Sequence, residues 1–327
     1  MAGWNNNQLR KYNIKFEKIP VLQHDDPKVN SLLCNNKPVL IKGSKLVSSV
    51  LNWDLDYLQK HMSSVCCNVM VSTNHKFKYY DQKKITPSIT FKPQSRPSSM
   101  TFSEFAERMK TWKKGAPRLY LQQTLNNSIG HHVVRDFVMF NWDWVMSKQK
   151  ICKWGALTSN LLLISQEGNI TPCHYDEQQN MFAVVKGYKR FILFPPSQFE
   201  CLYPHPVHHP YDRQSQVDFD NPNYTMFPKF KDACGYEAVV GPEDVLYIPI
   251  YWFHHVESLM SGGYTVSINF WFKAGPIEKI EYPLQDYQKM AIMRNVEKML
   301  GEALHDPNDV GSMLRTIVVG RYTSEEL

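Results

Sequence analysis

The sequence predicts a mainly β protein with flanking helices, in which short strands form an antiparallel barrel or sandwich. From Leu119 to Phe272, short apolar runs are separated by turn residues, a pattern typical of such folds. The clearest helical periodicities lie before and after this stretch. The chain has 327 residues, 43% of them hydrophobic, which is enough to bury a sizeable core in one large domain or two smaller ones.

The composition excludes several classes of protein. Charged residues make up 21% and aromatic residues 13%, which is unlike a disordered or collagen-like chain. Lys and Arg number 37 against 31 Asp and Glu, without a dense basic block, so nucleic-acid binding is not expected. No apolar run approaches the ~20 residues of a membrane span. The seven cysteines include no C-x-x-C motif and residues 1–11 are polar, so we expect a reduced, intracellular protein.

One strand and two helices are expected before the barrel. Residues 38–42 form a short apolar run typical of a strand. A helix is expected from Asp54, since acidic residues occupy its first turn. Another follows Thr101, which forms a T-x-x-E capping box with Glu104 ahead of apolar residues at helical spacing. Residues 1–36 are polar, and we expect them to run over the surface.

Apolar runs mark the strands of the barrel. They lie at 161–164, 180–185, 188–194, 245–250 and 264–272. Lys186-Gly187 separates two of these runs and is short enough for a β-hairpin. Residues 195–234 are rich in Pro, His and Tyr and too irregular for regular elements, and long loops of this kind are often functional.

Two amphipathic helices are predicted near the C-terminus. The first includes the periodic apolar residues from Ala291 to Leu300, with Gly301 interrupting the pattern, and the second covers 310–319. The apolar faces pack either on their own domain or on a second copy of the chain, and the pattern leaves both possibilities open.

The segment that carries chemistry is Thr171-Pro-Cys-His-Tyr-Asp176. Alternate residues of a strand share a face, so His174 and Asp176 should point into one cavity. Together with a second histidine they would form the 2-His-1-carboxylate triad, which holds Fe(II) and leaves positions open for substrate and oxygen. The H-x-D/E motif alone is weak, because His24 and His255 begin two others.

His254 is the candidate for the second histidine, since it follows a turn and a buried apolar run. Considered alone, it would more often be an ordinary core or surface histidine. Its neighbour His255 would face the other side of the strand, and we assign it no metal. The cluster His205-Pro-Val-His-His209 resembles a zinc site, but it lacks Cys and carboxylates at ligand spacing, so a surface loop is favoured.

The chain resembles a known family. The region from Asn160 to Phe272 resembles the jumonji-C double-stranded β-helix, a cupin-like jelly-roll, of the Fe(II)- and 2-oxoglutarate-dependent oxygenases. More narrowly, residues 38–322 are similar to the asparaginyl hydroxylases that inhibit hypoxia-inducible factor. The matching phrases are Arg118-Leu-Tyr-Leu-Gln-Gln123, His174-Tyr-Asp-Glu-Gln-Gln-Asn180, Lys186-Gly-Tyr-Lys-Arg190, Asp212-Arg-Gln-Ser-Gln-Val-Asp218, Glu281-Tyr-Pro283, Ala291-Ile-Met-Arg-Asn295 and Gly320-Arg-Tyr322. The resemblance implies an N-terminal α/β region at 1–117, a catalytic core at 118–273 and a helical dimerisation region at 274–327.

The resemblance also implies roles for individual residues. The residues that match iron ligands are His174, Asp176 and His254. Those that match the 2-oxoglutarate site and its surroundings are Lys189, Tyr120, Thr171, Asn180 and Asn269. Those that match substrate contacts are Tyr79, Arg213, Gln214 and Trp271, and Leu314 matches a position in the dimer interface. The implied pairing of the Lys189 ammonium with the distal carboxylate of 2-oxoglutarate is chemically apt.

The implied activity is hydroxylation of the β-carbon of asparagine in protein substrates. Fe(II) is the implied cofactor, 2-oxoglutarate and O2 are the implied cosubstrates, and ascorbate supports activity. The implied substrates are the hypoxia-inducible factor alpha subunit and ankyrin-repeat proteins, with a role in oxygen sensing. A homodimer in the cytoplasm and nucleus is implied, with no nucleic-acid or membrane partner. Cys173 stands where the family has a smaller residue, and we hypothesise that it makes the site sensitive to oxidation.

Three alternatives use the same residues differently. A jumonji-C lysine demethylase would share the iron site but would need a cage for methyl-lysine, which we do not find in the sequence. A cupin-like binding module without turnover would have no need of Lys189, Tyr120 and Thr171. A scaffold that sequesters transcription factors would tolerate the loss of iron, so sensitivity to a chelator distinguishes it from an enzyme.

Overall fold

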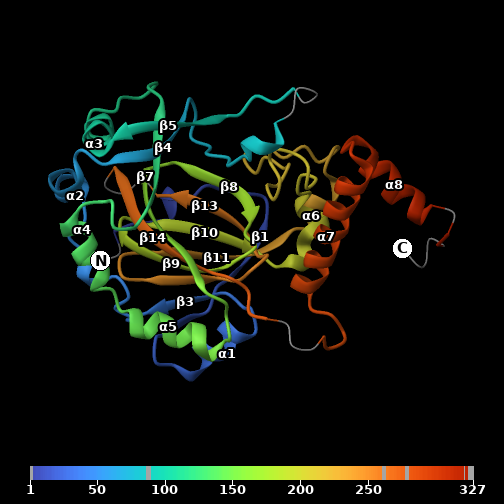
Figure 1. Cartoon of the computed structure of the whole chain (residues 1–327), viewed down its shortest axis with the longest axis horizontal. Coiled ribbons are helices and arrows are strands. Elements are labelled where there is room, and N and C mark those ends of the chain that lie inside the picture. Colours follow the sequence, from blue (N-terminus) through green and yellow to red (C-terminus); the bar gives the residue numbers. More distant parts are fainter. Residues whose placement is uncertain (1–2, 86–89, 260–262, 277–279, 320, 323–327) are drawn as a thin grey trace.

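Two β-sheets form a jelly-roll barrel, and helices lie outside it (Figure 1). The computed structural model describes residues 3–85, 90–259, 263–276, 280–319 and 321–322. The larger sheet has the order β2 (Val21–Gln23), β3 (Val39–Lys42), β12 (Val245–Ile248), β9 (Gln179–Lys186), β14 (Tyr264–Phe272), β7 (Leu157–Gln166), β6 (Arg118–Thr124), β4 (Cys66–Ser72) and β5 (Ser95–Thr101). The smaller sheet has the order β1 (Lys15–Lys18), β11 (Cys234–Val240), β10 (Lys189–Phe194), β13 (Phe253–Ser258) and β8 (Ile170–Tyr175). The predicted fold class is therefore confirmed.

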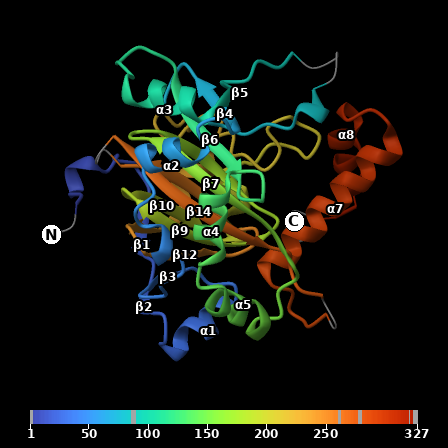
Figure 2. The ribbon, with the colours of Figure 1, turned by 60° about the vertical axis from the view of Figure 1, so that its left-hand side comes forward.

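The α-helices are α1 (Pro27–Cys34), α2 (Leu55–Met62), α3 (Phe102–Lys110), α4 (His131–Val138), α5 (Trp142–Ile151), α6 (Phe199–Leu202), α7 (Asp286–Leu304) and α8 (Asn308–Val318). Short 3-10 helices lie at Asn6–Gln8, Ser48–Val50, Gln82–Lys84, Pro196–Gln198 and Pro228–Asp232. Helices α1 to α5 lie along the larger sheet (Figure 2). None of the helices in the described residues is both long and apolar enough to cross a lipid bilayer.

The larger sheet separates an apolar outer layer from the barrel interior. On β14, Ile268 and Phe270 pack outward with side chains of α2 and α3, such as Leu58 and Phe105. The residue between them, Asn269, lines the interior cavity instead. Because strand residues alternate between faces, a strand buried on both sides can place polar groups in the interior without disturbing the helix-covered core.

Both helices predicted before the barrel are confirmed, and of the predicted capping box only the bond to the Thr101 hydroxyl is present. The Asp54 carboxylate accepts a hydrogen bond from the amide of Tyr57 at 2.8 Å, and the Thr101 hydroxyl accepts one from the amide of Glu104 at 3.2 Å. These bonds satisfy amide groups in the first helical turns. The expectation that residues 1–36 only cover the surface is wrong, since β1 pairs with β11 and α1 buries Val29.

The predicted hairpin around Lys186-Gly187 is also wrong. β9 and β10 are joined by this short connection, but β9 pairs with β12 and β14 in the larger sheet, whereas β10 pairs with β11 and β13 in the smaller sheet. Gly187 has φ +77°, and a Cβ there would lie 2.9 Å from the carbonyl oxygen of Tyr264. The turn therefore carries the chain from one sheet to the other, which a run of apolar residues cannot reveal.

The expectation that all the cysteines are reduced differs from the structure at one pair. Cys34 at the end of α1 and Cys152 just after α5 form a disulfide across a sequence separation of 118 residues. The other five cysteines are free. Spacing in the sequence gives no signal for a pair that the fold brings together over such a distance.

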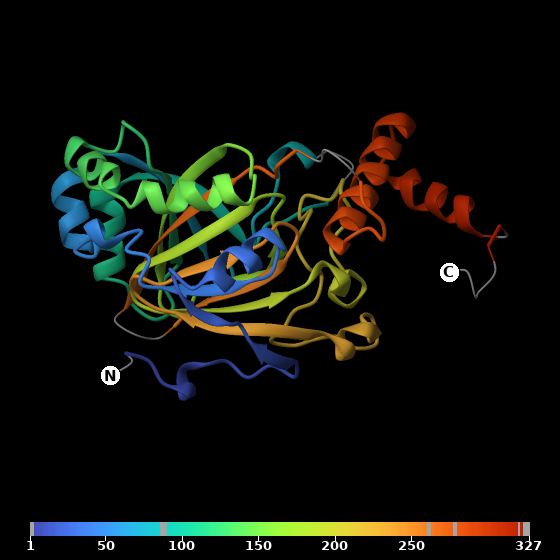
Figure 3. The same ribbon diagram turned by 90° about the horizontal axis from the view of Figure 1, so that it is seen from below.

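The two C-terminal helices are present and extend away from the barrel (Figure 3). α7 continues through Gly301 to Leu304 and buries Met290 against the barrel side of the molecule. Apolar side chains at least about a third exposed remain on the two helices, namely Ile292, Met293, Met299, Met313, Leu314 and Ile317. Gly320, part of one phrase of the resemblance, lies outside the described residues.

Candidate active site

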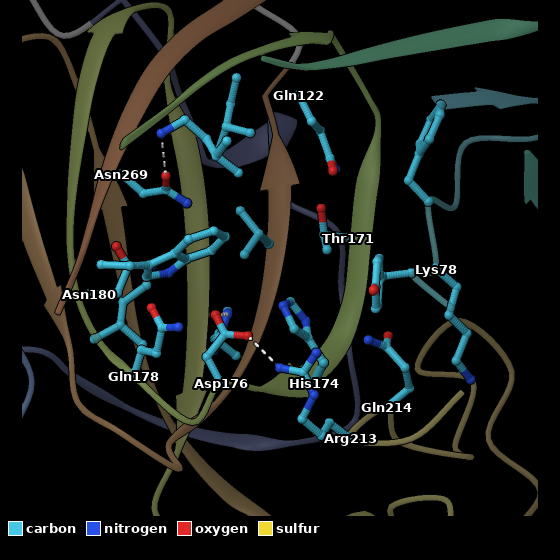
Figure 4. Close-up of a pocket in the computed structure, with 18 of the residues that line it drawn as sticks. Lys78, Gln122, Thr171, His174, Asp176, Gln178, Asn180, Arg213, Gln214 and Asn269 are labelled. Atoms are coloured by element: carbon cyan, nitrogen blue, oxygen red, sulfur yellow. Dashed lines mark hydrogen bonds and ion pairs between the residues drawn. The ribbon is translucent and has the colours of Figure 1, made fainter. Parts of the chain in front are cut away.

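A cavity of about 650 Å³ lies between the two sheets. It brings together all twelve residues that the sequence placed in the iron, 2-oxoglutarate and substrate sites, namely Tyr79, Tyr120, Thr171, His174, Asp176, Asn180, Lys189, Arg213, Gln214, His254, Asn269 and Trp271. Figure 4 shows that Thr171 and His174 of β8, Asp176 just after β8 and Asn180 of β9 point into the same space. Leu314 lies elsewhere, 36% exposed on α8.

The three predicted metal ligands lie together at the end of β8 and β13. One ligand atom each from His174, Asp176 and His254 lies within 4.8 Å of the others. His174 Nδ1 lies 2.8 Å from the carbonyl oxygen of Pro172, and a carbonyl can only accept, so Nδ1 carries the proton. Nε2 is then left with a lone pair for a metal.

The electrostatics of the three groups suit a divalent cation. Burial lowers the pKa of both His174 and His254, so both imidazoles stay neutral, which is the metal-binding form. Burial alone would raise the pKa of Asp176, but the Arg213 guanidinium beside its carboxylate outweighs burial, and the pKa lies below its usual value. Two neutral imidazoles and one carboxylate form the donor set of non-haem Fe(II) sites, so the residues present fit iron.

Lys189 lies deeper in the barrel and is only 2% exposed. Its Nζ lies 5.3 Å from the ring centre of Tyr120 and 5.6 Å from that of Phe182. No carboxylate of the described residues forms an ion pair with it, and burial lowers its pKa to about 7. Because an unpaired buried cation is unfavourable, this position is suited to the carboxylate of a bound ligand. The residues therefore fit 2-oxoglutarate.

Two polar side-chain atoms beside the metal position form no hydrogen bond within the described residues. The side-chain oxygen of Asn180 and the indole nitrogen of Trp271 are buried without a hydrogen-bond partner in the described residues. The Asn269 side chain is held, since its oxygen accepts from the amide of Leu161 at 3.1 Å. Unsatisfied buried polar atoms are rare in folded proteins and indicate a site that is completed by a ligand.

Two of the predicted substrate residues, Arg213 and Gln214, contact metal ligands at the edge of the cavity. Arg213 NH1 lies 3.1 Å from Asp176 Oδ1. Gln214 is 1% exposed, forms an antiparallel bridge with His174, and has a side-chain oxygen without a partner. Tyr79 is 52% exposed. The role of these residues in binding a peptide stays a prediction from the resemblance.

Arg294 and Asp212, which had no role predicted from the sequence, also line the cavity. Arg294 comes from α7, outside the barrel, and is 8% exposed. The signal that could have identified it is a cation four residues after Met290 on the buried face of an amphipathic helix. Asp212 lies in the irregular stretch after α6, where no periodicity indicates which side chains are buried.

Other residues considered in the sequence lie outside the cavity. Cys173 is buried in an apolar cluster with Tyr175, and burial raises its pKa, so the thiol is protonated. This argues against the proposed sensitivity to oxidation. Within the described residues, the triad is the only set of three or more His, Cys, Asp or Glu spaced to hold a metal, and His205 and His209 are stacked 4.1 Å apart instead.

A model of the cupin-like domain matches residues 27–277. Lysine-specific demethylase JMJ31 of Arabidopsis thaliana is 31% identical over 125 residues, which cover 38% of this chain and 22% of that protein. HSPB1-associated protein 1 of Homo sapiens is 38% identical over 116 residues, covering 34% and 23%. Lysine-specific demethylase 8 of Danio rerio is 38% identical over 105 residues, covering 32% and 25%. The aligned part therefore spans about a quarter of the length of these relatives.

Proposed function

The chain belongs to the cupin-like domain family, and on this premise we propose that it is an Fe(II)- and 2-oxoglutarate-dependent dioxygenase that hydroxylates the β-carbon of asparagine in proteins. The family and the triad of His174, Asp176 and His254 indicate an oxygenase of this class. The choice of asparagine is the finer step, and it rests on the substrate end of the cavity and on the resemblance to the hydroxylases that inhibit hypoxia-inducible factor.

The observation that carries the proposal is that unpaired polar groups lie on both sides of the triad. Lys189 offers a buried cation to a dicarboxylate. Gln214 offers a buried amide oxygen that has no hydrogen-bond partner within the part of the chain that the structure describes, and leaving such an acceptor unsatisfied costs about 1–3 kcal/mol. A primary amide supplies N–H donors that match it, whereas a trimethylated lysine has no N–H. This favours asparagine over trimethyl-lysine.

The residues of the chain bind and orient the reactants. Lys189, with the hydroxyls of Tyr120 and Thr171, would hold the distal carboxylate of 2-oxoglutarate, so that its other end faces the triad. Arg213 and Gln214 would place the asparagine side chain beside the metal position. The bound iron and 2-oxoglutarate supply the oxidation, in which one oxygen atom of O2 enters the C–H bond and the other enters succinate as CO2 is released.

The test is mass spectrometry of asparagine-containing peptides from a hypoxia-inducible factor transactivation region and from an ankyrin repeat. Each peptide is incubated with the protein, Fe(II), 2-oxoglutarate and ascorbate, with and without a chelator. A gain of one oxygen on asparagine that the chelator abolishes supports the proposal. A parallel methyl-lysine peptide tests the activity that the names of two relatives suggest. Demethylation without asparagine oxidation would overturn the choice of substrate.

The C-terminal helices support a second proposal, that the protein is a homodimer. α8 presents Met313, Leu314 and Ile317, 36–40% exposed, and α7 carries the exposed Met293 and Met299. An apolar face of this kind, on helices that extend from the barrel, is suited to a symmetric interface with a second copy. Location in the cytoplasm and nucleus stays a prediction from the resemblance.

A further inference from the structure

We propose that Arg294 is a positioning residue that fixes the substrate loop from outside the barrel. In this proposal, Arg294 on α7 holds Asp212, and Asp212 in turn keeps Arg213 and Gln214 in the conformation that faces the reacting side chain. The expected changes in kinetics rest on the proposed function, whereas the effect of Arg294 on the conformation of the loop does not.

The contact between Arg294 and Asp212 is bidentate and buried. NH1 and NH2 of Arg294 each lie 2.6 Å from one oxygen of Asp212, and the two residues are 8% and 7% exposed. NH1 also donates to the Tyr175 hydroxyl at 3.2 Å, and Nε forms an ion pair with Glu177. A planar guanidinium that engages both oxygens fixes the direction of the carboxylate as well as its position.

The two residues after Asp212 are held by contacts with β8 and with Asp176, which follows it. The Arg213 carbonyl oxygen accepts from the amide of Tyr175 at 3.2 Å, and its guanidinium reaches Asp176. Gln214 bridges to His174. The segment 212–214 is thus fixed at one end by α7 and at the other by β8.

Arg213 has a backbone conformation that requires such support. Its φ is +68°, in the left-handed region that residues with a side chain rarely adopt. A strained conformation persists only when the surrounding contacts determine it, and such residues cluster at functional sites. Without the contact to Arg294, the Lys84 ammonium, at 2.6 Å, is the one partner of the Asp212 carboxylate that remains among the described residues. The segment should then relax, and the Gln214 amide should lose its orientation.

The expected effect is confined to one end of the cavity. Lys189, Tyr120 and Thr171 make no contact with Arg294, so binding of 2-oxoglutarate should not change. Misplacement of the substrate contacts should raise KM for the peptide and lower its kcat/KM by about 10- to 100-fold.

The experiment compares the wild-type chain with Arg294→Lys, Asp212→Asn and Arg190→Lys. Arg294→Lys keeps the charge but loses the bidentate contact, and Asp212→Asn weakens the same contact without changing the groups around Glu177. Arg190→Lys is the matched control, because Arg190 is 4% exposed and pairs with Glu237 through two nitrogens, away from the cavity. Melting temperature and sedimentation are recorded for every variant.

Two readouts test the proposal. The first is hydrogen–deuterium exchange of segment 211–216, where the amides of Gln214 and Ser215 donate to backbone carbonyls. The second is the kinetics of peptide hydroxylation, compared with peptide-independent formation of succinate and with KM for 2-oxoglutarate. We expect faster exchange and a higher peptide KM in Arg294→Lys and Asp212→Asn, with 2-oxoglutarate parameters within about twofold of wild type, and neither effect in Arg190→Lys.

If hydrogen–deuterium exchange of segment 211–216 is the same as in the wild type in both Arg294→Lys and Asp212→Asn, the proposal is overturned. A parallel loss of 2-oxoglutarate binding, or the same pattern in Arg190→Lys, would also overturn it, since the role of Arg294 would then be general stability. A wild type that forms succinate but oxidises no asparagine would overturn the proposed function alone, because the exchange measurement still decides whether Arg294 fixes the loop.

Discussion

His174 and His254 lie directly opposite each other across the β8–β13 pair, with their ring centroids 4.1 Å apart. Each Nδ1 contacts the carbonyl oxygen two residues earlier in its own chain segment, that of Pro172 or that of Trp252. The two rings are therefore held in the same tautomer, with both Nε2 atoms available on one side. Asp176 completes the set, 3.8 Å from His254 Nε2.

This arrangement predicts the effect of removing the carboxylate. Asp176→Ala should lower turnover by more than about 100-fold. Even the substitution of a residue that only supports a metal ligand lowers metal affinity or activity by about 10- to 100-fold, and Asp176 is itself a ligand. The fold should stay intact, since the side chain lies in a cavity and not in a packed core. Succinate formation and the far-UV circular dichroism spectrum measure the two effects. Normal consumption of 2-oxoglutarate by Asp176→Ala would show that the triad is assigned incorrectly.

The burial of Lys189 predicts how binding of 2-oxoglutarate depends on pH. Only the protonated amine attracts the carboxylate, and burial lowers the Lys189 pKa to about 7 in the absence of ligand. KM for 2-oxoglutarate should therefore be constant below about pH 7 and rise about tenfold per unit above it.

Lys189→Met tests the same group by substitution. It should raise KM by about 10- to 100-fold, since a hydrogen bond to a charged group contributes about 1.5–3 kcal/mol, and it should remove the rise of KM above pH 7. Lys186→Met is the matched control, because that lysine is exposed and pairs with Asp54. A wild-type KM that does not change between pH 6 and 9 would contradict the assignment.

The exposed face of α8 predicts the effect of a charge at Leu314. Leu314→Arg should give monomers in sedimentation velocity and weaken peptide hydroxylation, because an apolar interface does not accommodate an unpaired charge. Thr316→Arg places the same charge on another face of the helix and should remain dimeric. If Leu314→Arg sediments like the wild type, the interface lies elsewhere.

The Cys34–Cys152 disulfide predicts a redox-dependent stability. It closes 118 residues of sequence, and loss of a cross-link over such a loop lowers the free energy of unfolding by up to about 5 kcal/mol. Cys34→Ser should therefore unfold at a lower denaturant concentration than the wild type under oxidising conditions. The two proteins should become alike in the presence of a reductant. Equal midpoints under oxidising conditions would contradict a stabilising disulfide.

The sequence predicted those features that depend on neighbouring residues. The helices after Asp54 and Thr101 are encoded within one turn, where a side chain caps backbone amides. The spacing of His174 and Asp176 placed two ligand types on one face of a strand. A turn and a buried apolar run made His254 the candidate for the second histidine. The resemblance supported that role and added the role of Lys189, which the sequence pattern alone leaves as an ordinary lysine.

The tertiary structure decided which distant segments meet. Gly187 carries the chain between the sheets, so two strands that look like a hairpin lie in different layers. The Cys34–Cys152 disulfide and the Arg294–Asp212 contact join residues far apart in sequence. Caps and strand alternation are set by interactions over a few residues, so the sequence determines them directly. Long-range pairs form only because burial of the whole core brings them together, and no local pattern records which partner each residue will meet.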